Sequence, residues 1–255
     1  MSGLAILTRK EMTESIRTRR LPVVVVLFAG LGILSVLTAR YLPEILELAL
    51  GDEAAAIPIP VPSVADAIVE LQQNIGQFGA LTAIVLAMGM VAWEKERGTA
   101  AFVLSKPATR GAFLGAKVVA LAIVLGLATA VGASIAWVYT AILFEPLPPG
   151  GWVALAVLAW LGLMAWAAIT FLASTVLRSA AAAAGIGIVA LLGLSIVSAI
   201  PTVGRWLPPG LEGPARVLAS GGAVAMTDLT AIAGTIAVIA VALGASWLSF
   251  RRQEL

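Results

Sequence analysis

Long uncharged runs separated by short polar segments dominate the chain. Apolar stretches with no Asp, Glu, Lys or Arg inside them lie at about residues 21–39, 76–93, 118–144, 152–177, 179–200 and 229–250. A helix needs about 20 predominantly apolar residues to cross the hydrocarbon core of a bilayer. The pattern therefore predicts an all-α membrane protein, with six transmembrane helices in a single domain that covers residues 1–255.

Residues 4–19 precede the first apolar run and predict an amphipathic helix on the membrane surface. At 100° per residue, apolar and charged positions fall on opposite faces: Ala5, Met12 and Ile16 against Lys10, Glu14 and Arg17. Lys10 and Glu14 are also spaced for an i,i+4 ion pair. An equally open alternative is a positively charged start that only orients the first span.

The distribution of cations predicts an orientation. If the N-terminus is cytoplasmic, thirteen of the 16 Lys and Arg residues fall on inner segments, and only Arg40, Arg205 and Arg216 fall on outer ones. Cytoplasmic enrichment of Lys and Arg sets the orientation of membrane proteins. We therefore expect a multi-pass protein of the cell inner membrane with both termini cytoplasmic.

The two longer outer segments, 41–75 and 201–228, carry their own structural signals. In the first, Ser63 and Asp66 resemble a capping box, and a narrow helical stripe follows it at Val64, Ile68, Leu71 and Ile75. We expect this stripe to pack on the chain's own outer surface rather than on an extracytoplasmic partner. The second segment is rich in Pro and Gly and predicts a short helix over 211–220, in either a re-entrant element or a plain outer loop.

Small residues four apart open the fifth apolar run. Ala181 with Gly185, and Ala183 with Gly187, would let two helices approach closely. The partner helix belongs either to the same chain or to a second copy, and the spacing favours neither.

The composition excludes several function classes. The chain is 60% hydrophobic and 12% charged, and it contains no Cys and no His. Cysteine or histidine metal sites and Ser–His or Cys–His nucleophile pairs are therefore excluded, and no GxxxxGK[ST] phosphate loop is present. Spans without ionisable residues disfavour an ion-coupled secondary transporter or channel. We expect no catalysis and no nucleic-acid partner.

The segment 93–117 is a short, mostly cationic connector between the second and third apolar runs. Gly98 suits the position just after a helix, where a positive φ is needed, and Thr99 can start a short helix that ends before Pro107. Thr109 can cap the third span. The pattern is typical of a short helix held between two spans, which would tilt both of them when pushed.

Three short motifs in the chain resemble those of a known family. Arg9-Lys10-Glu11, Glu94-x-Glu96-x-Gly98-Thr99, and Leu104-Ser105-Lys106-Pro107-x-x-Arg110 with Lys117 are similar to those of ABC transporter permeases of the second, exporter-related class. Within that class the chain most resembles the permease of the nitrous oxide reductase maturation system. The resemblance covers the whole chain.

The resemblance implies a homodimer, or a heterodimer with a similar chain, docked on two separate ABC ATPase subunits that bind ATP and Mg²⁺. It implies no cofactor in this chain, and a re-entrant element within 201–228. It assigns the coupling helix to the connector, with the role falling on Glu94, Glu96, Arg97, Gly98, Thr99, Lys106, Pro107 and Arg110. Phe102 and Leu104 are the apolar anchors expected on that helix. An alternative is a subunit that transmits motion to an extracytoplasmic partner without transport.

Overall fold

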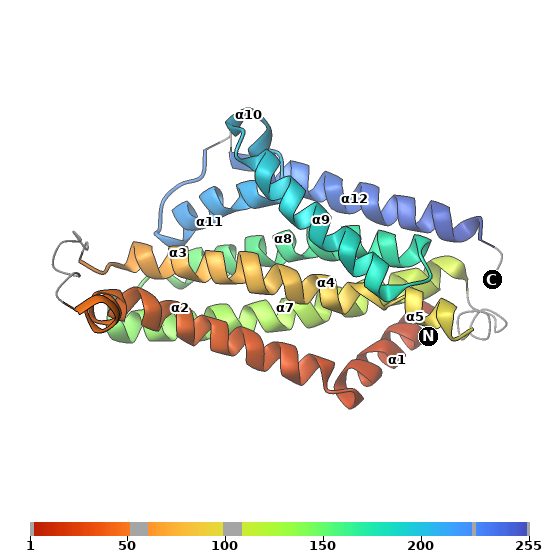
Figure 1. Ribbon diagram of the computed structural model, residues 1–255, viewed down its shortest axis with the longest axis horizontal. Coiled ribbons are helices and arrows are strands. Elements are labelled where there is room, and N and C mark those ends of the chain that lie inside the picture. Colours follow the sequence, from red (N-terminus) through yellow and green to blue (C-terminus); the bar gives the residue numbers. More distant parts are fainter. Residues whose placement is uncertain (1–2, 52–60, 99–108, 226–227, 254–255) are drawn as a thin grey trace.

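The computed structural model describes residues 3–51, 61–98, 109–225 and 228–253 (Figure 1). These residues form helices and connections without a strand, and six helical stretches are long and apolar enough to cross a membrane. The stretches are α2 (Arg20–Leu50), α3 to α5 (Val64–Glu96), α7 (Arg110–Leu143), α8 (Pro149–Val176), α9 (Ala180–Ser198) and α12 (Leu229–Arg251). The predicted all-α membrane fold and its six spans are confirmed.

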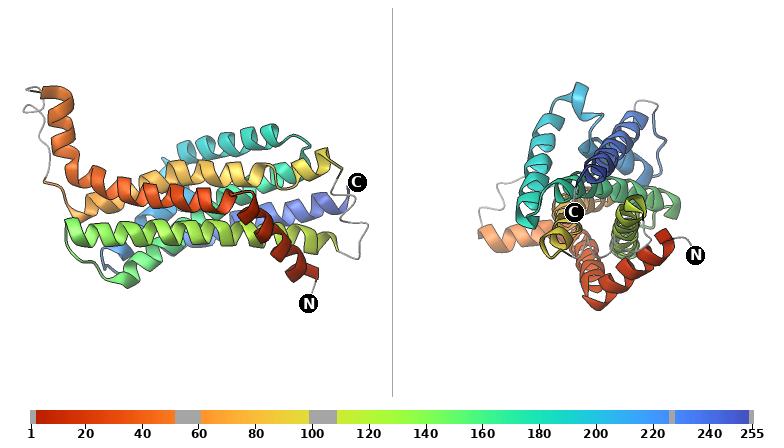
Figure 2. Two further views of the ribbon diagram at one scale, coloured as in Figure 1. Left: turned by 90° about the horizontal axis from the view of Figure 1, so that it is seen from below. Right: turned by 90° about the vertical axis from the view of Figure 1, so that its right-hand side faces the viewer.

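The helices form a bundle around α7 and α8. The first span, α2, packs along α7, while α4 (Ala80–Met88), α9 and α12 pack on α8. Figure 2 shows the bundle end-on, with α9 and α12 at its periphery. Exposed apolar side chains such as Val189 on α9 and Val241 on α12 suit a helix that faces lipid.

A pair of glycines allows a close backbone contact between α2 and α7. A Cβ atom built on Gly32 of α2 would collide with the carbonyl oxygen of Gly132 on α7, and one on Gly132 would lie 2.7 Å from the carbonyl oxygen of Phe28. The two backbones therefore touch without an intervening side chain, as small residues allow in membrane helices.

The second span is made of several pieces. After α3 (Val64–Asn74) comes the π-helix η2 (Ile75–Gly79), then α4, a turn at 89–91 and the short helix α5 (Ala92–Glu96). The backbone N–H groups of Val91 and Ala92 donate to the hydroxyl of Ser174 on α8, at 3.2 and 3.0 Å. This hydroxyl satisfies amides that a break in a transmembrane helix would otherwise leave without partners.

Helix α3 begins as predicted. The Ser63 backbone N–H donates to the Asp66 carboxylate at 2.8 Å, which is the acidic half of the expected capping box. Ile68, Leu71 and Ile75 of the predicted stripe are buried, against α2 and neighbouring elements of the same chain. The stripe packs on this chain, as expected.

Helices α2, α3 and α7 extend past the end of α9 on the side opposite the chain termini (Figure 1). At 1.5 Å per residue, the 34 residues of α7 measure about 51 Å and the 19 of α9 about 28 Å. Helix α2 bends at Tyr41, just before Pro43, and residues 43–50 form an arm that projects from the bundle (Figure 2, left).

The segment after α9 forms α10 (Pro201–Gly204), the 3₁₀ helix η3 (Pro208–Leu211) and α11 (Glu212–Ala219). The short helix predicted over 211–220 is thus present as α11. It lies on α8 and α3, and the carbonyl oxygen of Leu218 contacts Gly151 near the start of α8. It runs along α8 from Leu211, which lies beside Gly162, toward the end of the bundle away from the chain termini (Figure 1), and the re-entrant course expected from the family resemblance stays a prediction.

The N-terminal helix α1 (Gly3–Arg17) packs mainly on α7 and meets α2 at Arg19, whose φ is +60°. Its inward, half-buried side is made by Leu7, Thr8, Glu11, Met12 and Ser15. Of the predicted apolar face, Met12 is half-buried against the bundle, while Ala5 and Ile16 are exposed from the protein, so the placement of that face on the membrane surface stays a prediction. The side of α1 that packs on the bundle brings Glu11 to a buried lysine of α7.

Candidate functional site

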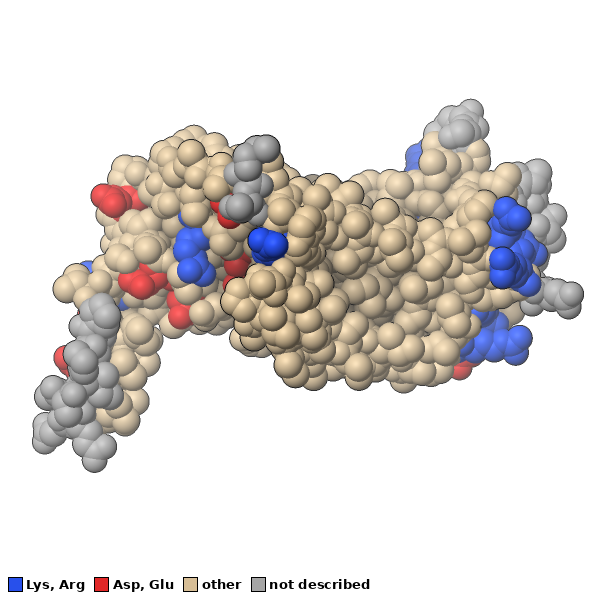
Figure 3. Space-filling view, turned by 90° about the horizontal axis from the view of Figure 1, so that it is seen from above, with Lys and Arg blue, Asp and Glu red and all other residues tan. Residues whose placement is uncertain are grey.

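Lys and Arg side chains gather at one end of the molecule, to the right in Figure 3. We call this the basic end; it is where α1, α5, the start of α7, the end of α8 and the end of α12 meet (Figure 1). The opposite, far end carries α3, α11 and the arm of α2. The two described flanks of the connector, up to Gly98 and from Thr109, both lie at the basic end.

A buried lysine lies between the connector's first flank and the N-terminal helix. Only 2% of the Lys117 side chain is exposed, and its Nζ lies 2.6 Å from Oε1 of Glu94 on α5 and 3.1 Å from Oε1 of Glu11 on α1. The ring of Phe113, one turn earlier on α7, lies 5.0 Å from the same nitrogen. Two carboxylates and a ring thus compensate a charge that would otherwise be costly to bury.

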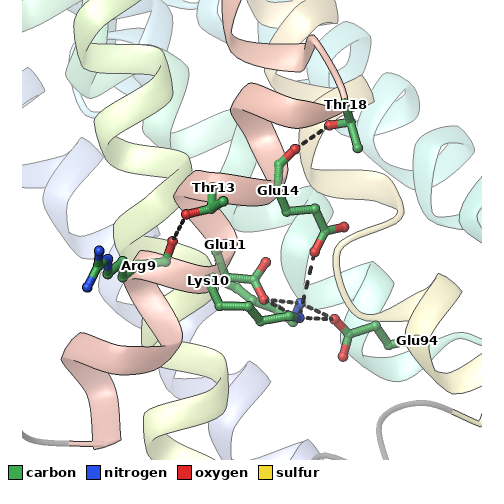
Figure 4. Close-up of polar contacts among 8 residues, drawn as sticks. Arg9, Lys10, Glu11, Thr13, Glu14, Thr18 and Glu94 are labelled. Carbon is green, nitrogen blue, oxygen red and sulfur yellow. Dashed lines mark hydrogen bonds and ion pairs between the residues drawn. The ribbon is translucent and has the colours of Figure 1, made fainter.

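A second lysine closes the group. Lys10 Nζ lies 3.1 Å from Glu11, 3.6 Å from Glu94 and 3.7 Å from Glu14, the last being the predicted i,i+4 pair. Burial lowers the pKa of Lys10, but the carboxylates of Glu11, Glu94 and Glu14 outweigh it and hold that pKa above its ordinary value. Figure 4 shows these side chains converging. We call Lys10, Glu11, Glu14, Glu94 and Lys117 the charge cluster; it joins α1, α5 and α7.

The second flank is tied to the last helix. Arg110 Nη1 donates to the backbone carbonyls of Phe250, Arg251 and Gln253, at 3.1, 2.8 and 3.0 Å. These carbonyls end α12, where a helix leaves acceptors without intrahelical donors and carries partial negative charge. Arg110 therefore caps α12 while it starts α7.

The two flanks share a third anchor on α8. The carbonyl oxygen of Thr175 accepts from Lys95 Nζ at 2.7 Å and from Gln253 Nε2 at 3.1 Å. Lys95 lies on the first flank, and Gln253 belongs to the turn that Arg110 holds. The connector is therefore bound to the bundle on both sides.

The residues assigned to coupling fall into three groups. Glu94 and Arg110 are engaged within the chain, whereas Glu96, Arg97 and Gly98 are exposed. Gly98 has φ +69°, as predicted for its position after the helix, and the Thr109 hydroxyl caps α7 by accepting from Ala112 N–H at 3.1 Å. The remaining candidates lie outside the described residues: Thr99, Phe102, Leu104, Lys106 and Pro107.

The small residues of α9 divide between two surfaces. Gly187 packs inside the chain, where an added Cβ would collide with the Thr170 hydroxyl and lie 3.0 Å from Ile84, and Ala183 is buried with it. Ala181 and Gly185 are exposed, and an added Cβ on Gly185 would meet nothing within 4 Å. One pair therefore serves intrachain packing and the other faces outward.

Sequence reasoning found the connector but missed the partners of its flanks. Lys117 and Arg110 gave a signal only as members of the family motif and as cations near the start of a span. Their partners on α1 and α12 are remote in sequence and follow no spacing rule.

Comparison with known proteins yields two findings. The family model described as ABC-2 family transporter protein matches residues 5–255. An "uncharacterized transmembrane protein YxlG" of Bacillus subtilis (strain 168) is 28% identical over 213 residues, which cover 82% of this chain and 81% of that protein.

Proposed function

Because this chain belongs to the ABC-2 transporter family and is therefore the permease subunit of an ABC transporter, we propose that it converts ATP hydrolysis by a separate ATPase subunit into movement of its spans. The connector 93–117 is the element that receives the movement. ATP and Mg²⁺ are bound by the partner, and this chain contributes no catalytic group.

The anchoring of both connector flanks carries this proposal. On one side Glu94 is bound to Lys117 and the charge cluster, and on the other Arg110 is bound to the end of α12. A displacement of the connector must therefore move α1, α7 and α12 together or break charge-assisted hydrogen bonds, each worth about 1.5–3 kcal/mol.

The exposed part of the first flank is the surface offered to the ATPase. Glu96, the last residue of α5, and Arg97, which follows it, are exposed charges, and charges at the rim of an interface mainly set orientation and association rate. Phe102 and Leu104 are the proposed apolar anchors of the same surface.

The outward face of α9 is the proposed contact with a second permease copy. Ala181 and Gly185 permit close helix approach, and apolar side chains continue the same exposed side at Val189 and Ile196. The resulting homodimer would bring two connectors to one side, matching two ATPase subunits.

The orientation follows from the basic end. Cations at membrane-protein ends are retained on the cytoplasmic side, so α1, the connector and both termini face the cytoplasm and the far end faces outward across the cell inner membrane. The motifs quoted above support the finer proposal that the chain is similar to the nitrous oxide reductase maturation permease.

The chain contains no cysteine, so a cysteine introduced at one position is the only thiol that a maleimide can label in that variant. Arg97, Leu48 and Gly213, all exposed, are replaced by cysteine one at a time, and intact cells are treated with an impermeant maleimide. We expect labelling at positions 48 and 213 but not at position 97.

A short bifunctional crosslinker on the Arg97→Cys variant should capture an ABC ATPase, identified by its phosphate-loop peptide, and Leu48→Cys is the matched control. Maleimide labelling at position 97, or ATPase capture from position 48 instead of 97, contradicts the proposal.

One observation favours a second function, transmission of motion to an extracytoplasmic partner. The arm of α2 projects from the bundle, and Leu48 on it is 91% exposed. Deletion of residues 43–50 separates the two functions. A transporting permease keeps its cellular activity without the arm, whereas a motion-transmitting subunit loses that activity and retains its ATPase.

A further inference from the structure

A cavity of about 440 Å³ lies within a single chain, away from the basic end, between α3, η2, α8, α9, η3 and α11. It lies level with the last turn of α9, whose Ser195 and Ser198 line it. Because α9 is just long enough to cross a bilayer, the cavity opens near the boundary between hydrocarbon and head groups.

The lining divides into an apolar wall and a polar rim. Leu158 and Trp166 of α8 and Leu191 of α9 contribute to the wall. Gln73, Gln77 and Glu212 contribute to the rim. A pocket with apolar walls and a few convergent polar groups is the usual form of a small-molecule site.

The π-helix η2 brings its own side chains to this cavity. Ile75, Gly76 and Gln77 line it, and a Cβ built on Gly76 would lie 3.6 Å from Oε1 of Glu212. The carboxylate of Glu212 therefore lies over the glycine of a π-turn, and π-turns inside α-helices recur at functional sites.

Glu212 lies at the mouth of the cavity and is exposed on its outer side. The neighbouring polar side chains, Gln72 and Arg216, make hydrogen bonds that do not involve its carboxylate. Gln72 donates from Nε2 to the Glu212 backbone carbonyl at 2.8 Å, and its Oε1 accepts from Arg216 Nε at 3.3 Å. Within the part of the chain that the structure describes, no side chain donates a hydrogen bond to the Glu212 carboxylate. Partial desolvation raises the pKa of Glu212, and the Arg216 guanidinium offsets this only in part.

We propose that this cavity binds an amphiphile whose primary ammonium head group pairs with the Glu212 carboxylate and whose hydrocarbon chain lies along the wall of α8 and α9. An ammonium supplies the donors and the positive charge that the carboxylate lacks. The side-chain carbonyl oxygens of Gln73 and Gln77, both exposed residues, can accept hydrogen bonds from its remaining N–H groups. A single-chain amine and the ethanolamine head group of a phospholipid both present this chemistry.

The test uses the purified full chain in phosphatidylcholine nanodiscs, without an ATPase, so that its outcome is independent of the coupling proposal. The probe is a single-chain primary amine with a diazirine in the chain and an alkyne at its end, and the comparison probe carries a hydroxyl in place of the ammonium. Crosslinked peptides are mapped by mass spectrometry. We expect the amine to label the α8 peptide that contains Leu158 and Trp166.

Two variants decide the role of the carboxylate. Glu212→Gln should lower amine labelling about five-fold or more, since a hydrogen bond to a charged group is lost. Glu47→Gln makes the same change of charge on the exposed arm, outside the cavity, and should leave labelling unchanged. Equal labelling of α8 by the alcohol probe, or parental labelling of Glu212→Gln, overturns the proposal.

The lipid composition identifies the source of the head group. If an ethanolamine phospholipid is the occupant, replacing half of the phosphatidylcholine by phosphatidylethanolamine should suppress amine labelling. If the site takes a free amine, labelling persists in both lipids.

Discussion

The ammonium nitrogen of Lys117 lies 2.6 Å from a carboxylate oxygen of Glu94, although the two residues belong to helices on opposite sides of the connector. The same nitrogen binds Glu11 of the N-terminal helix at 3.1 Å. One buried cation thus joins the last turn of the second span, the first turns of the third span and the helix that begins the chain. Its removal is the most direct way to separate the connector from the bundle.

Replacing this cation should destabilise the fold. Lys117→Met leaves Glu11 and Glu94 close together and largely buried, with Lys10 alone to compensate them. Breaking a buried pair by removing one partner costs about 3 kcal/mol or more, so the melting temperature of the purified chain in detergent should fall by several degrees.

Neutralising the two carboxylates as well separates the effect of charge from the effect of packing. In a Lys117→Met chain, further replacement of Glu11 and Glu94 by Gln should recover part of the lost stability, because no uncompensated buried charge remains. A Lys117→Met chain with the parental melting temperature would show that the cluster contributes nothing to stability.

Arg110→Glu should release the end of α12. The substitution removes three hydrogen bonds to carbonyl groups and places a negative charge at the negative end of the helix dipole. Loss of about 1.5 kcal/mol corresponds to roughly ten-fold faster amide hydrogen exchange over residues 247–253. In the assembled transporter the variant should retain some ATPase but lower its turnover.

Arg97→Glu is the matched control for Arg110→Glu, with the same change of charge at an exposed position. It should leave exchange in α12 at the parental rate. Similar exchange in all three proteins would mean that Arg110 does not hold the helix end.

Two neighbouring glycines of α9 should respond differently to leucine. Gly187→Leu drives a side chain into Thr170 and Ile84, and overpacking of this kind costs about 1–3 kcal/mol. Gly185→Leu meets open space, so it should leave the melting temperature unchanged and reduce the dimer fraction measured by light scattering. An unchanged dimer fraction in Gly185→Leu would move the dimer contact away from this face of α9.

Glu212→Gln should stabilise the chain in a pH-dependent way. Burial raises the folded pKa of Glu212 above its ordinary value, so folding opposes ionisation, and stability is lost as pH rises from the unfolded pKa through the folded one. The variant lacks this loss, so at pH 7 it should melt at a higher temperature than the parent. The gain in the free energy of unfolding should be less than about 1 kcal/mol, because the carboxylate is partly hydrated. At pH 4 the two should converge; a gap that does not shrink contradicts the assignment.

The spans and their local caps could be predicted because their signals lie within a few residues. Uncharged runs located the six spans, and the pairs Ser63 with Asp66 and Thr109 with Ala112 formed because a helix start needs only local partners. Gly98 adopts positive φ for the same local reason.

The contacts of the basic end could not be predicted from pattern. Lys117 and Glu11 are separated by 106 residues, and Arg110 and Arg251 by 141, so only the packed bundle brings them together. The side of α1 that packs on the bundle was unpredictable for the same reason, because Glu11 finds its partner Lys117 on a remote helix. The break in the second span could not be predicted from the sequence either, since Ser174, whose hydroxyl accepts from its free amides, lies on another helix.

That break also decides which span can carry a force across the molecule. Between Met88 and Ala92 the second span has no continuous helical hydrogen-bond ladder, so under the proposed coupling a push on α5 would reach α4 only through this turn. The third span has no such joint: α7 runs for 34 residues from Arg110 and meets α2 backbone to backbone at Gly132. If the connector receives the movement as proposed, we expect the stiffer route to the far end to run along α7, with α2 beside it, and the second span to be the more compliant connection.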